Sequence, residues 1–517
     1  MIYVIGSGLS GIAAAIALVK RGYHPTILDV GLTADPEASA LKARLSSIEP
    51  EAWTSEDLHR VKQTGPASQS GIPQKLSFGS DFAYRDPDAP TAAQLHNASM
   101  LRSFARGGFS NVWGAVIQRF PPDEFRRWPL TLHQISPHYS AVQDLMCSSS
   151  GPLVRPSAQA RAFYTDLARN RLELERYGIR FDYASLAVRS SDSDWEKSCR
   201  RCGLCLYGCP YDSIFAAGVT LARLVDEGTV SHIPNVVVDR VIPGSGRVRV
   251  EGRSVQNHSP RAFEGCAVFI AAGLLESARI ILNSTTRKAG AEAALRIRTS
   301  DIFTLPMLRY HSVPHTTTER MHTLCQIVMN IDDPGISEHP VHLQLYGYND
   351  LYPELLARKT GAFSRPLKPV LRHLSERLFV AFGYLHSEIS STVRFVPAAR
   401  LGGRMTVEGQ ENPESRRVVS AVGRKLFRTR KYLRGIPITP QVKFDLPGGG
   451  IRSGGCFPMR SAPTGLESDL WGSVPGLPQV HIVDSSVLPT IPAGPLAFTV
   501  MANAHRIASE CPISHDE

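Results

Sequence analysis

The beginning of the chain alternates between short apolar runs and polar turns. Residues 1–6 form an apolar run that predicts a buried strand, the apolar stretch after Gly11 predicts a helix, and a second predicted strand ends at Asp29. Because a strand already begins at Met1, there is no room for the charged and apolar regions of a signal peptide. The pattern predicts a strand-helix-strand unit, and we expect a cytoplasmic protein.

The first turn of this unit has glycines at three fixed positions. Gly6, Gly8 and Gly11 form the pattern G-x-G-x-x-G directly between strand and helix, and Asp29 lies at the end of the second strand. Such glycines permit a tight turn, the close approach of a pyrophosphate and the packing of helix on strand, while the acid bonds a ribose. The segment predicts dinucleotide binding without separating FAD from NAD. The alternative is a strand-turn-helix with coincidental glycines.

The composition is that of an ordinary globular protein. The chain has 517 residues, of which 43% are hydrophobic and 20% charged, and at about 100–200 residues per domain this predicts two or three domains. No apolar run approaches the roughly 18 residues that span a bilayer. The sequence therefore excludes a transmembrane topology.

Three later segments extend the nucleotide signature. They are a glycine-flanked turn at 105–115, a strand-helix at 269–279, and a run from a buried strand into a helix at 481–509. Together with Gly6, Gly8 and Gly11, their order and spacing resemble the glucose-methanol-choline (GMC) flavin oxidoreductases over most of the chain. The resemblance implies an α/β fold, in which a Rossmann-type FAD-binding domain is interleaved with an α+β substrate domain built on an antiparallel sheet.

The same resemblance implies domain boundaries and an FAD site. Residues 1–305, which include a cysteine-rich loop at 195–215, and residues 455–517 would form the FAD-binding domain, and residues 306–454 the substrate domain. Besides Gly6, Gly8, Gly11 and Asp29, the implied FAD-binding residues are Gly107, Gly108, Ser110, Asn111, Val241, Ala272, Gly273, Asp484 and Ser485. Asp484 has the alternative role of a turn cap.

The catalytic pair of the family is missing. Family members oxidise an alcohol by hydride transfer to flavin while a histidine handles the hydroxyl proton, with a His or Asn as its partner. In this chain the histidine position holds Ile451 or Arg452, and the partner position holds Gly494. Arg452 cannot act as a base, because its pKa exceeds about 12. It can stabilise an alkoxide or hold a carboxylate or phosphate, so we predict an electrostatic role for it.

A base would then come from the middle of the chain. His311, His315 and His322 lie in segments that would face the flavin in such an architecture. Each of them has the alternative role of a satisfied surface or core histidine. We interpret His505, in the last predicted helix, as structural.

Four cysteines lie within eleven residues. Cys199, Cys202, Cys205 and Cys209 form C-x2-C-x2-C-x3-C followed by Pro210, the spacing of bacterial ferredoxins. No second run accompanies them, so a [4Fe-4S] and a [3Fe-4S] cluster both stay open, with zinc and unliganded thiols as competitors. The run is similar to the cysteine-rich loop of some sugar dehydrogenase flavoproteins of this family, which implies electron transfer to an external acceptor. The alternative is a loop that only rigidifies the structure.

The net charge of +10 comes from two short segments of the chain. Residues 358–377 carry +5 and residues 416–434 carry +8, which leaves the rest near −3. Leu371, Leu374, Leu378 and Phe382 recur at helical spacing in and after the first segment, a pattern typical of a basic amphipathic helix that lies on an anionic membrane or packs on its own core. An anionic or membrane-associated substrate or acceptor, such as a quinone or a lipid-linked glycan, would fit. Nucleic acid is disfavoured, since no recognition motif accompanies the charge.

These patterns lead to one main hypothesis and two alternatives. We expect an FAD-dependent dehydrogenase that oxidises a CH–OH group of a sugar, glycoside or polyol, with electrons leaving through an iron-sulfur loop to a protein or quinone. It would be cytoplasmic, or peripheral to the inner face of the membrane. One alternative is a different redox reaction on an anionic or lipid-linked substrate held by Arg452. The other is a catalytically degenerate flavin-binding partner protein.

Overall fold

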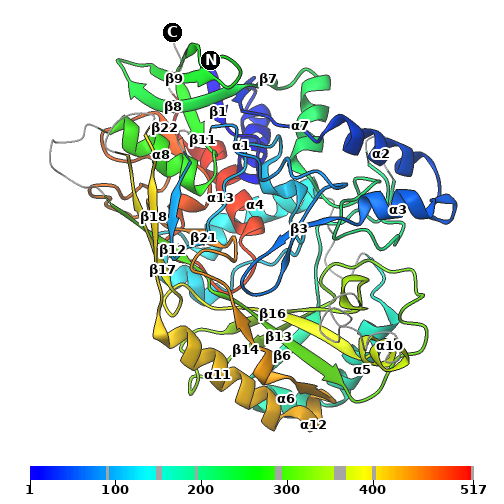
Figure 1. Cartoon of the computed structure of the whole chain (residues 1–517). Helices are drawn as coiled ribbons and strands as arrows, with labels where there is room; N and C mark the ends of the chain where they lie inside the picture. The colour runs from blue at the N-terminus through cyan, green and yellow to red at the C-terminus, as the bar shows by residue number, and fades with distance from the viewer. Residues whose placement is uncertain are drawn as a thin grey trace.

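The computed structural model describes residues 1–88, 92–146, 154–192, 196–285, 294–353, 368–398 and 403–513. Two bodies follow one another from top to bottom in Figure 1. The upper body contains a parallel sheet and is called here the parallel-sheet domain, and the lower one is called the antiparallel-sheet domain. The predicted α/β architecture with a parallel and an antiparallel sheet is confirmed.

The parallel sheet is assembled from both ends of the chain. Its order is β22 (Val480–Ile482), β11 (Ala267–Ile270), β1 (Ile2–Ile5), β2 (Thr26–Leu28) and β7 (Ser231–Ile233). The strands are continuous apolar runs, as expected for strands buried on both faces. Helices α1 (Leu9–Lys20), α4 (Leu132–Leu145), α7 (Ala217–Asp226), α8 (Leu274–Ser284) and α13 (Ala497–Glu510) surround it, and α13 packs on α1 and α4.

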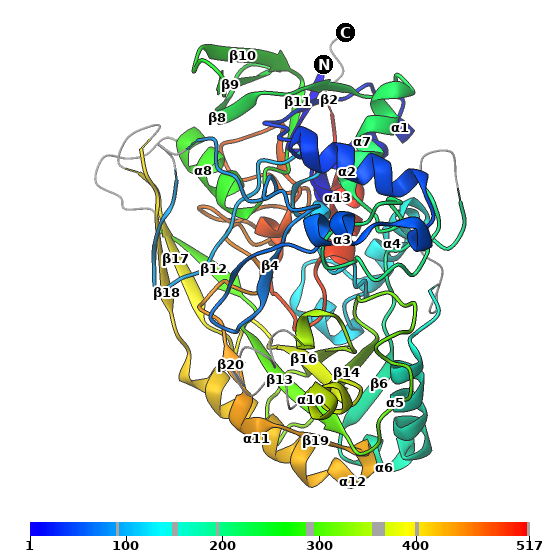
Figure 2. The same cartoon turned by 45° about the vertical axis from the view of Figure 1, so that its right-hand side comes forward.

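Smaller elements surround this core. An antiparallel sheet of β8 (Val236–Pro243), β9 (Val248–Ser254) and β10 (Pro260–Gly265) lies at its top in Figures 1 and 2. At its side are α2 (Pro36–Ser47), α3 (Ser55–Val61), β3 (Thr64–Ala67) and β4 (Pro73–Lys75). A second sheet, of order β21 (Ser453–Gly454), β12 (Leu295–Thr299), β17 (Thr392–Val396), β18 (Thr406–Gln410) and β5 (Gln94–His96), connects the two domains.

The antiparallel-sheet domain is built on one large sheet. Its order is β19 (Gly435–Pro437), β13 (Ile302–Arg309), β16 (Leu378–Tyr384), β15 (Val341–Tyr346), β14 (Ile327–Ile331) and β6 (Ile179–Tyr183), with β20 (Lys443–Phe444) also pairing with β13. Its helices are α5 (Ala158–Arg169), α6 (Arg171–Arg176), α10 (Lys368–Ser375), α11 (Pro413–Arg428) and α12 (Arg430–Leu433). Residues 158–183 thus belong to this domain, and the sequence boundary at 305/306 falls inside β13.

The helix observed in the first basic segment is shorter than the hydrophobic spacing of the sequence predicts. α10 ends at Ser375, and Leu378 and Phe382 lie on β16. In β16 the buried side chains of Phe379 and Ala381 alternate with less buried ones, so period-two pairing with β13 and β15 overrides the helical spacing. Residues 358–367 of the first basic segment lie outside the described residues.

β15 separates two interiors. Val341, Leu343 and Leu345 pack in the core of the antiparallel-sheet domain. The alternating residues are His342, Gln344 and Tyr346, and Tyr346 belongs to the core of the parallel-sheet domain. Because successive strand residues point to opposite faces, a polar stripe lies at the junction of the domains.

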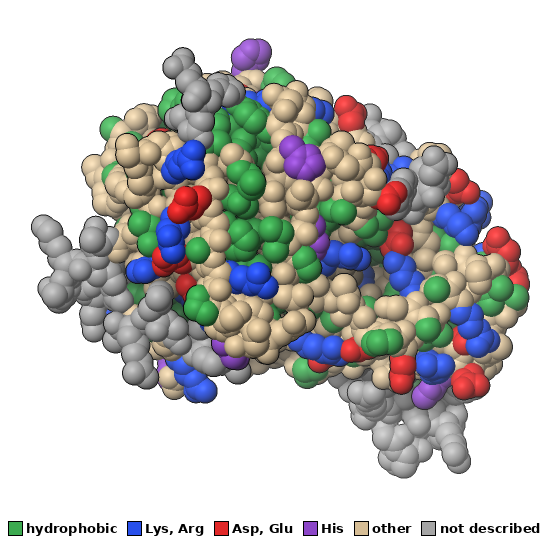
Figure 3. Space-filling view, turned by 90° about the horizontal axis from the view of Figure 1, so that it is seen from above, with side chains coloured by type: hydrophobic (Ala, Val, Ile, Leu, Met, Phe, Trp, Pro, Cys, Tyr) green, Lys and Arg blue, Asp and Glu red, His purple; other side chains and the backbone are tan. Residues whose placement is uncertain are grey.

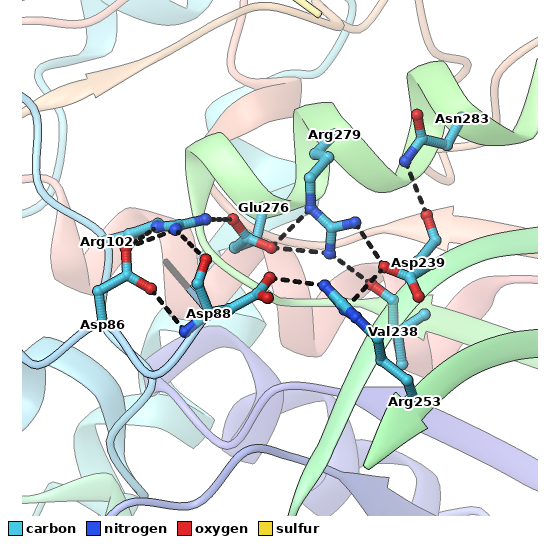
Figure 4. Close-up of polar contacts among 9 residues, drawn as sticks. All are labelled: Asp86, Asp88, Arg102, Val238, Asp239, Arg253, Glu276, Arg279 and Asn283. Carbon is cyan, nitrogen blue, oxygen red and sulfur yellow. Dashed lines mark hydrogen bonds and ion pairs between the residues drawn. The ribbon is translucent and has the colours of Figure 1, made fainter. Parts of the chain in front are cut away.

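A buried charge network fixes the segment around residues 86–102 to the parallel-sheet domain (Figure 4). Arg102 pairs with Asp86 and, at 2.7 Å, with Glu276 on α8. Arg279 bonds Glu276 at 2.9 Å and Asp239 on β8 at 3.0 Å. Figure 4 also shows Arg253 on β9, whose ion pair with Asp88 is 2.7 Å long. Among the described helices, none is long and apolar enough to cross a membrane.

Candidate active site and cysteine cavity

In the turn between β1 and α1, Gly6 and Gly11 are closely packed and Gly8 has free space beside it. A Cβ on Gly6 or Gly11 would collide with the backbone of Ala271 or of Gly6, so these glycines permit the packing of α1 against β1 and β11. At Gly8 no atom lies within 4 Å of where a Cβ would be. This space is at the N-terminus of α1, where free N–H groups favour an anion.

Ser7 connects three of the predicted FAD-binding segments. Its hydroxyl donates to Asp29 and accepts the N–H of Gly107 at 2.9 Å. A Cβ on Gly108 would lie 3.5 Å from the Cα of Gly8, so the two glycine turns face one another. Burial raises the pKa of Asp29 to about 6. Sequence reasoning missed Ser7, although its place between two motif glycines was a signal.

Ser110 and Asn111 shape the second glycine turn from within. Ser110 Oγ donates to the Gly107 carbonyl at 2.6 Å and accepts the N–H of Ala217 at 2.9 Å. Asn111 Nδ2 donates to the Gly108 carbonyl at 2.7 Å. Their hydrogen bonds therefore hold the left-handed Gly107 and Gly108, whose φ angles are 86° and 55°.

The C-terminal segment meets the same region. Asp484 accepts the N–H of Gly273 at 3.1 Å, the hydroxyl of Ser277 at 2.5 Å and the N–H of Ser486 at 3.0 Å. Burial raises the pKa of Asp484. A Cβ at Gly273 would meet nothing within 4 Å. Asp484 thus caps its own turn at Ser486 and also lies beside the turn at Gly273, which has free space next to it.

The remaining predicted FAD-binding residues are Ala272, Ser485 and Val241. Ala272 lies against Gly6, and the Ser485 carbonyl accepts the N–H of Gly455 at 3.0 Å. The N–H of Val241 donates to Ser284 Oγ at 2.8 Å. That N–H is therefore not free for an adenine, and Val241 is not carried into the proposed site.

Arg452 lies where the two domains meet. Its guanidinium carbon is 3.3 Å from the centroid of the Tyr384 ring, and its Nη1 donates to the Ala493 carbonyl at 2.5 Å. A Cβ on the neighbouring Gly494 would lie 3.9 Å from Gln118 Oε1, a buried acceptor without a partner among the described residues. The segments at 450–459 and 492–495 therefore come together, as the resemblance implies.

His342 is the histidine that the structure brings to Arg452. It lies directly opposite Tyr384 in the pairing of β15 with β16, with ring centroids 6.5 Å apart. Its Nδ1 is 2.8 Å from Asn330 Oδ1, an acceptor, which assigns the proton to Nδ1 and leaves a lone pair on Nε2. Burial and the charge of Arg452 lower the pKa of His342 to about 3. Sequence reasoning missed it, although polar residues alternate along residues 341–346.

At one end of the polar stripe on β15, Tyr346 lies close to the glycine segment at residues 105–115. A Cβ on Gly114 would lie 3.2 Å from the Tyr346 hydroxyl. Gln344 lies between the two ends of the stripe, 3.4 Å from His342 Nε2 and 3.4 Å from the Tyr346 hydroxyl. The polar face of β15 therefore lies against the domain that carries the glycine turns.

The predicted histidines lie elsewhere. The Ser300 N–H bonds the Arg452 carbonyl at 2.9 Å just before β13 begins. His311 follows the other end of this eight-residue strand, roughly 25 Å away at about 3.3 Å per residue. His311 and His315 are exposed, so neither joins Arg452. His505 is buried between α13 and α4, 2.9 Å from His138, a position that fits a structural residue.

All four cysteines of the run line one cavity of about 20 Å³ together with His322 and Leu324. Burial raises the pKa of Cys199 to about 12 and also raises that of Cys202, while backbone hydrogen bonds from Arg201 and Leu204 oppose these rises. Thr323 bonds Cys205 in the same way. In the described ranges, no three of the sulfurs lie within 4.8 Å of one another.

Lys75 on β4 adds a positive charge to this cavity. Burial lowers its pKa, and Cys205 and Cys209 act in the opposite direction. Its Nζ lies 3.5 Å from the Trp113 carbonyl. None of the carboxylates that the structure describes forms an ion pair with it.

His339, His386 and Glu388 also group within 4.8 Å. His386 accepts the Glu388 N–H at 3.1 Å on one nitrogen and lies 3.3 Å from Glu124 on the other. Glu388 also pairs with Arg127. These bonds already use both imidazole nitrogens of His386, so the group needs no metal to be satisfied.

Comparison with known proteins gives one informative result. No family model and no curated protein matches the chain. A solved structure titled pyridoxine 4-oxidase from Mesorbium loti is similar over 98% of both chains, with a TM-score of 0.61 and 15% sequence identity. The chain therefore shares the fold of that oxidase along nearly its whole length.

Proposed function

We propose that the protein is an FAD-dependent oxidoreductase of the GMC type that acts on a CH–OH group. The observation that carries the proposal is the junction at which Ser7 joins both glycine turns and the polar face of β15 meets Arg452. The fold shared with pyridoxine 4-oxidase supports it.

The residues present fit a bound dinucleotide. The open positions at Gly8 and Gly273 leave room for a pyrophosphate and a ribityl chain beside helix N-termini. Asp29 would bond the adenosine ribose, with Ser7 keeping its carboxylate in place. Gly107 and Gly108 would cover the pyrophosphate from the other side.

The chemistry divides between two side chains. Bound FAD would supply the hydride acceptor. Nε2 of His342 is the unprotonated nitrogen of a neutral imidazole and would take the hydroxyl proton of the substrate as the alcohol becomes a carbonyl. Burial and the charge of Arg452 keep the pKa of His342 at about 3, so it would act as a weak base. Arg452 stabilises the negative charge that develops on that oxygen. Tyr384 keeps the guanidinium plane in place.

The substrate is proposed to be a sugar, glycoside or related polyol. Hydroxyl groups would bond Gln344, Tyr346 and the unpartnered acceptor of Gln118. The second candidate is an anionic or lipid-linked substrate, favoured by the partly buried Arg452, which is described with no acidic partner. The two differ in whether substituting Arg452 lowers kcat or raises KM.

A test of the flavoenzyme proposal needs the purified protein and a panel of alcohols. Anaerobic addition of sugars, glycosides and polyprenyl glycans should bleach the flavin absorbance with one member of the panel. His342→Gln should slow bleaching while retaining bound flavin, and His311→Gln serves as the matched control. A purified protein without flavin overturns the proposal. Bound flavin that no alcohol reduces favours the degenerate partner protein instead.

The cysteine cavity is proposed to hold an iron-sulfur cluster through which electrons leave, which would make the protein a dehydrogenase. Zinc, with Zn–S bonds near 2.3 Å, would hold its four sulfurs about 3.8 Å apart. The four sulfurs line one cavity but do not group this closely in the described residues, so the proposal rests on the ferredoxin-like spacing in the sequence. Burial favours the protonated thiols, and Lys75 adds a positive charge that would favour thiolates once a metal binds.

Elemental analysis tests this part separately. Iron and sulfide in protein purified without air support the relay, and zinc without iron excludes it. Cys205→Ser should remove the metal, whereas Cys266→Ser, at a cysteine outside the run, should not.

A further inference from the structure

One end of the antiparallel-sheet domain is formed by short helices from two distant parts of the sequence. α6 and α12 lie side by side at the bottom of Figures 1 and 2, next to the end of α11. The rings of Tyr177 and Tyr432 are 6.0 Å apart, and Asn170 Nδ2 donates to the Tyr432 carbonyl at 3.0 Å. The surface formed by residues 169–177 and 424–436 is called here the basic tip.

The basic tip exposes more cations than acids: on α6 Arg171 and Arg176 pair with Glu175 and Glu173, whereas the cations of residues 428–434 form no ion pair in the described ranges. In the described part of the chain, no ion pair involves the exposed residues Arg424, Arg428, Arg430, Lys431 and Arg434. Earlier in α11, by contrast, Arg417 pairs with Glu414. Two of the cations lie on neighbouring rings, Arg430 at 4.4 Å from Phe427 and Lys431 at 4.5 Å from Tyr432.

Large apolar side chains project between these cations. Leu172 is 74% exposed, Phe427 46%, Tyr177 43% and Ile436 38%. The opposite face of α11 buries Val418, Val422 and Leu426 in the core, so the fold does not require the exposed groups. The other end of the molecule differs, because Figure 3 shows Lys and Arg side chains mixed with Asp and Glu there.

We propose that the basic tip binds the surface of a membrane that contains anionic lipids. Leu172 and Phe427 would enter the headgroup region while the cations around them bond lipid phosphates. Exposed apolar groups among an excess of basic side chains are characteristic of interfacial membrane binding. Nucleic acid would use the charge but leave the apolar groups in water. The inference does not depend on the redox chemistry proposed above.

The test measures co-sedimentation of the full-length protein with vesicles. Phosphatidylcholine vesicles with about 30% phosphatidylglycerol should bind the protein at low salt and release it at high salt, and pure phosphatidylcholine should bind it far less. Neutralising one residue should weaken binding about fivefold, so Arg428→Gln/Arg430→Gln/Lys431→Gln should weaken it roughly 100-fold. Arg247→Gln/Arg249→Gln/Arg261→Gln at the other end changes the net charge equally and should have little effect.

A second variant tests the apolar component. Leu172→Ser/Phe427→Ser should reduce binding to anionic vesicles and leave its salt dependence in place. Because all the substituted side chains are exposed, far-UV circular dichroism should be unchanged. Equal binding to neutral vesicles, no binding to either kind, or equal weakening by the control triple variant would overturn the proposal. So would a DNA duplex that displaces the protein from vesicles at the same salt concentration.

Discussion

The guanidinium of Arg452 stacks on the ring of Tyr384, with 3.3 Å between the guanidinium carbon and the ring centroid. Arg452 immediately precedes β21, and Tyr384 ends β16, so the contact joins the connecting sheet to the antiparallel sheet. A planar cation on an aromatic face keeps its charge with little hydration. The arginine is therefore held rigidly beside His342, its neighbour across the site.

Substituting Arg452 should impair catalysis more than folding. If it stabilises charge on the substrate oxygen, Arg452→Gln should lower kcat about 100- to 1000-fold with a smaller change in KM. Arg452→Lys should not rescue the loss, because lysine has no planar group to stack. Steady-state kinetics measure the effect, with Arg298→Gln on β12 as the control. Unchanged kinetics of Arg452→Gln would remove Arg452 from the site, and a rise in KM alone would make it an anion clamp.

The stability of the protein should fall as the pH is lowered below about 6.5. Burial lowers the pKa of His342 to about 3 and that of His505 to about 4 from the ordinary value of 6.5. The unfolded chain therefore binds protons that the folded chain excludes, and each pKa unit corresponds to about 1.4 kcal/mol. Urea unfolding at pH 7.5, 6.5 and 5.5 measures the slope.

Removing one of these histidines should flatten that slope. His505→Gln should reduce the pH dependence of the free energy of unfolding, and His258→Gln, at an exposed histidine, should leave it unchanged. A free energy of unfolding that is the same at pH 6.5 and 5.5 would contradict the burial of neutral imidazoles.

Lys75→Met should lower the reduction potential of the proposed cluster. A nearby cation stabilises the more negative, reduced form, and its loss should lower the potential by on the order of 50 mV. An anaerobic redox titration followed by absorbance measures the shift. Lys197→Met removes an exposed lysine of the same loop and should have little effect. An unchanged potential in Lys75→Met would exclude electrostatic coupling between Lys75 and the cluster.

Glu276→Gln should destabilise the parallel-sheet domain. Glu276 is 5% exposed and bonds both Arg102 at 2.7 Å and Arg279 at 2.9 Å. Weakening both bonds leaves buried guanidinium charge poorly compensated, which costs about 3–5 kcal/mol. Glu251→Gln breaks partly exposed pairs with Arg240 and Arg249 and should cost about 0–1 kcal/mol. Similar denaturation midpoints for the two variants would show that the buried network contributes little.

The turns of the proposed nucleotide site could be predicted from the sequence because their signals are local. Gly6, Gly8 and Gly11 are fixed by backbone geometry within one turn, and the parallel sheet follows from continuous apolar runs. The contact of Ser7 with Gly107 spans 100 residues and has no counterpart in local spacing.

The proposed catalytic half depends on strand pairing, which sequence spacing does not reveal. His342 and Tyr384 become neighbours only through the register of β15 with β16. His311 and His315 match the expected residue type, but the length of β13 carries them away from Arg452. The apolar spacing through Leu378 predicts a helix, but residues 378–384 form β16 because they pair with β13 and β15.

The position of β22 has a consequence for folding during synthesis. β22 covers the edge of β11, and α13 packs on α1, yet both elements lie within the last 40 residues of the chain. Until these residues leave the ribosome, β11 exposes an unpaired edge and α1 an apolar face, the features that promote aggregation of nascent chains. The strands of the antiparallel sheet, by contrast, all precede residue 445, so that sheet can form first. A chain truncated before residue 480 would thus keep the β11 edge and the apolar face of α1 exposed and would need chaperones to stay in solution.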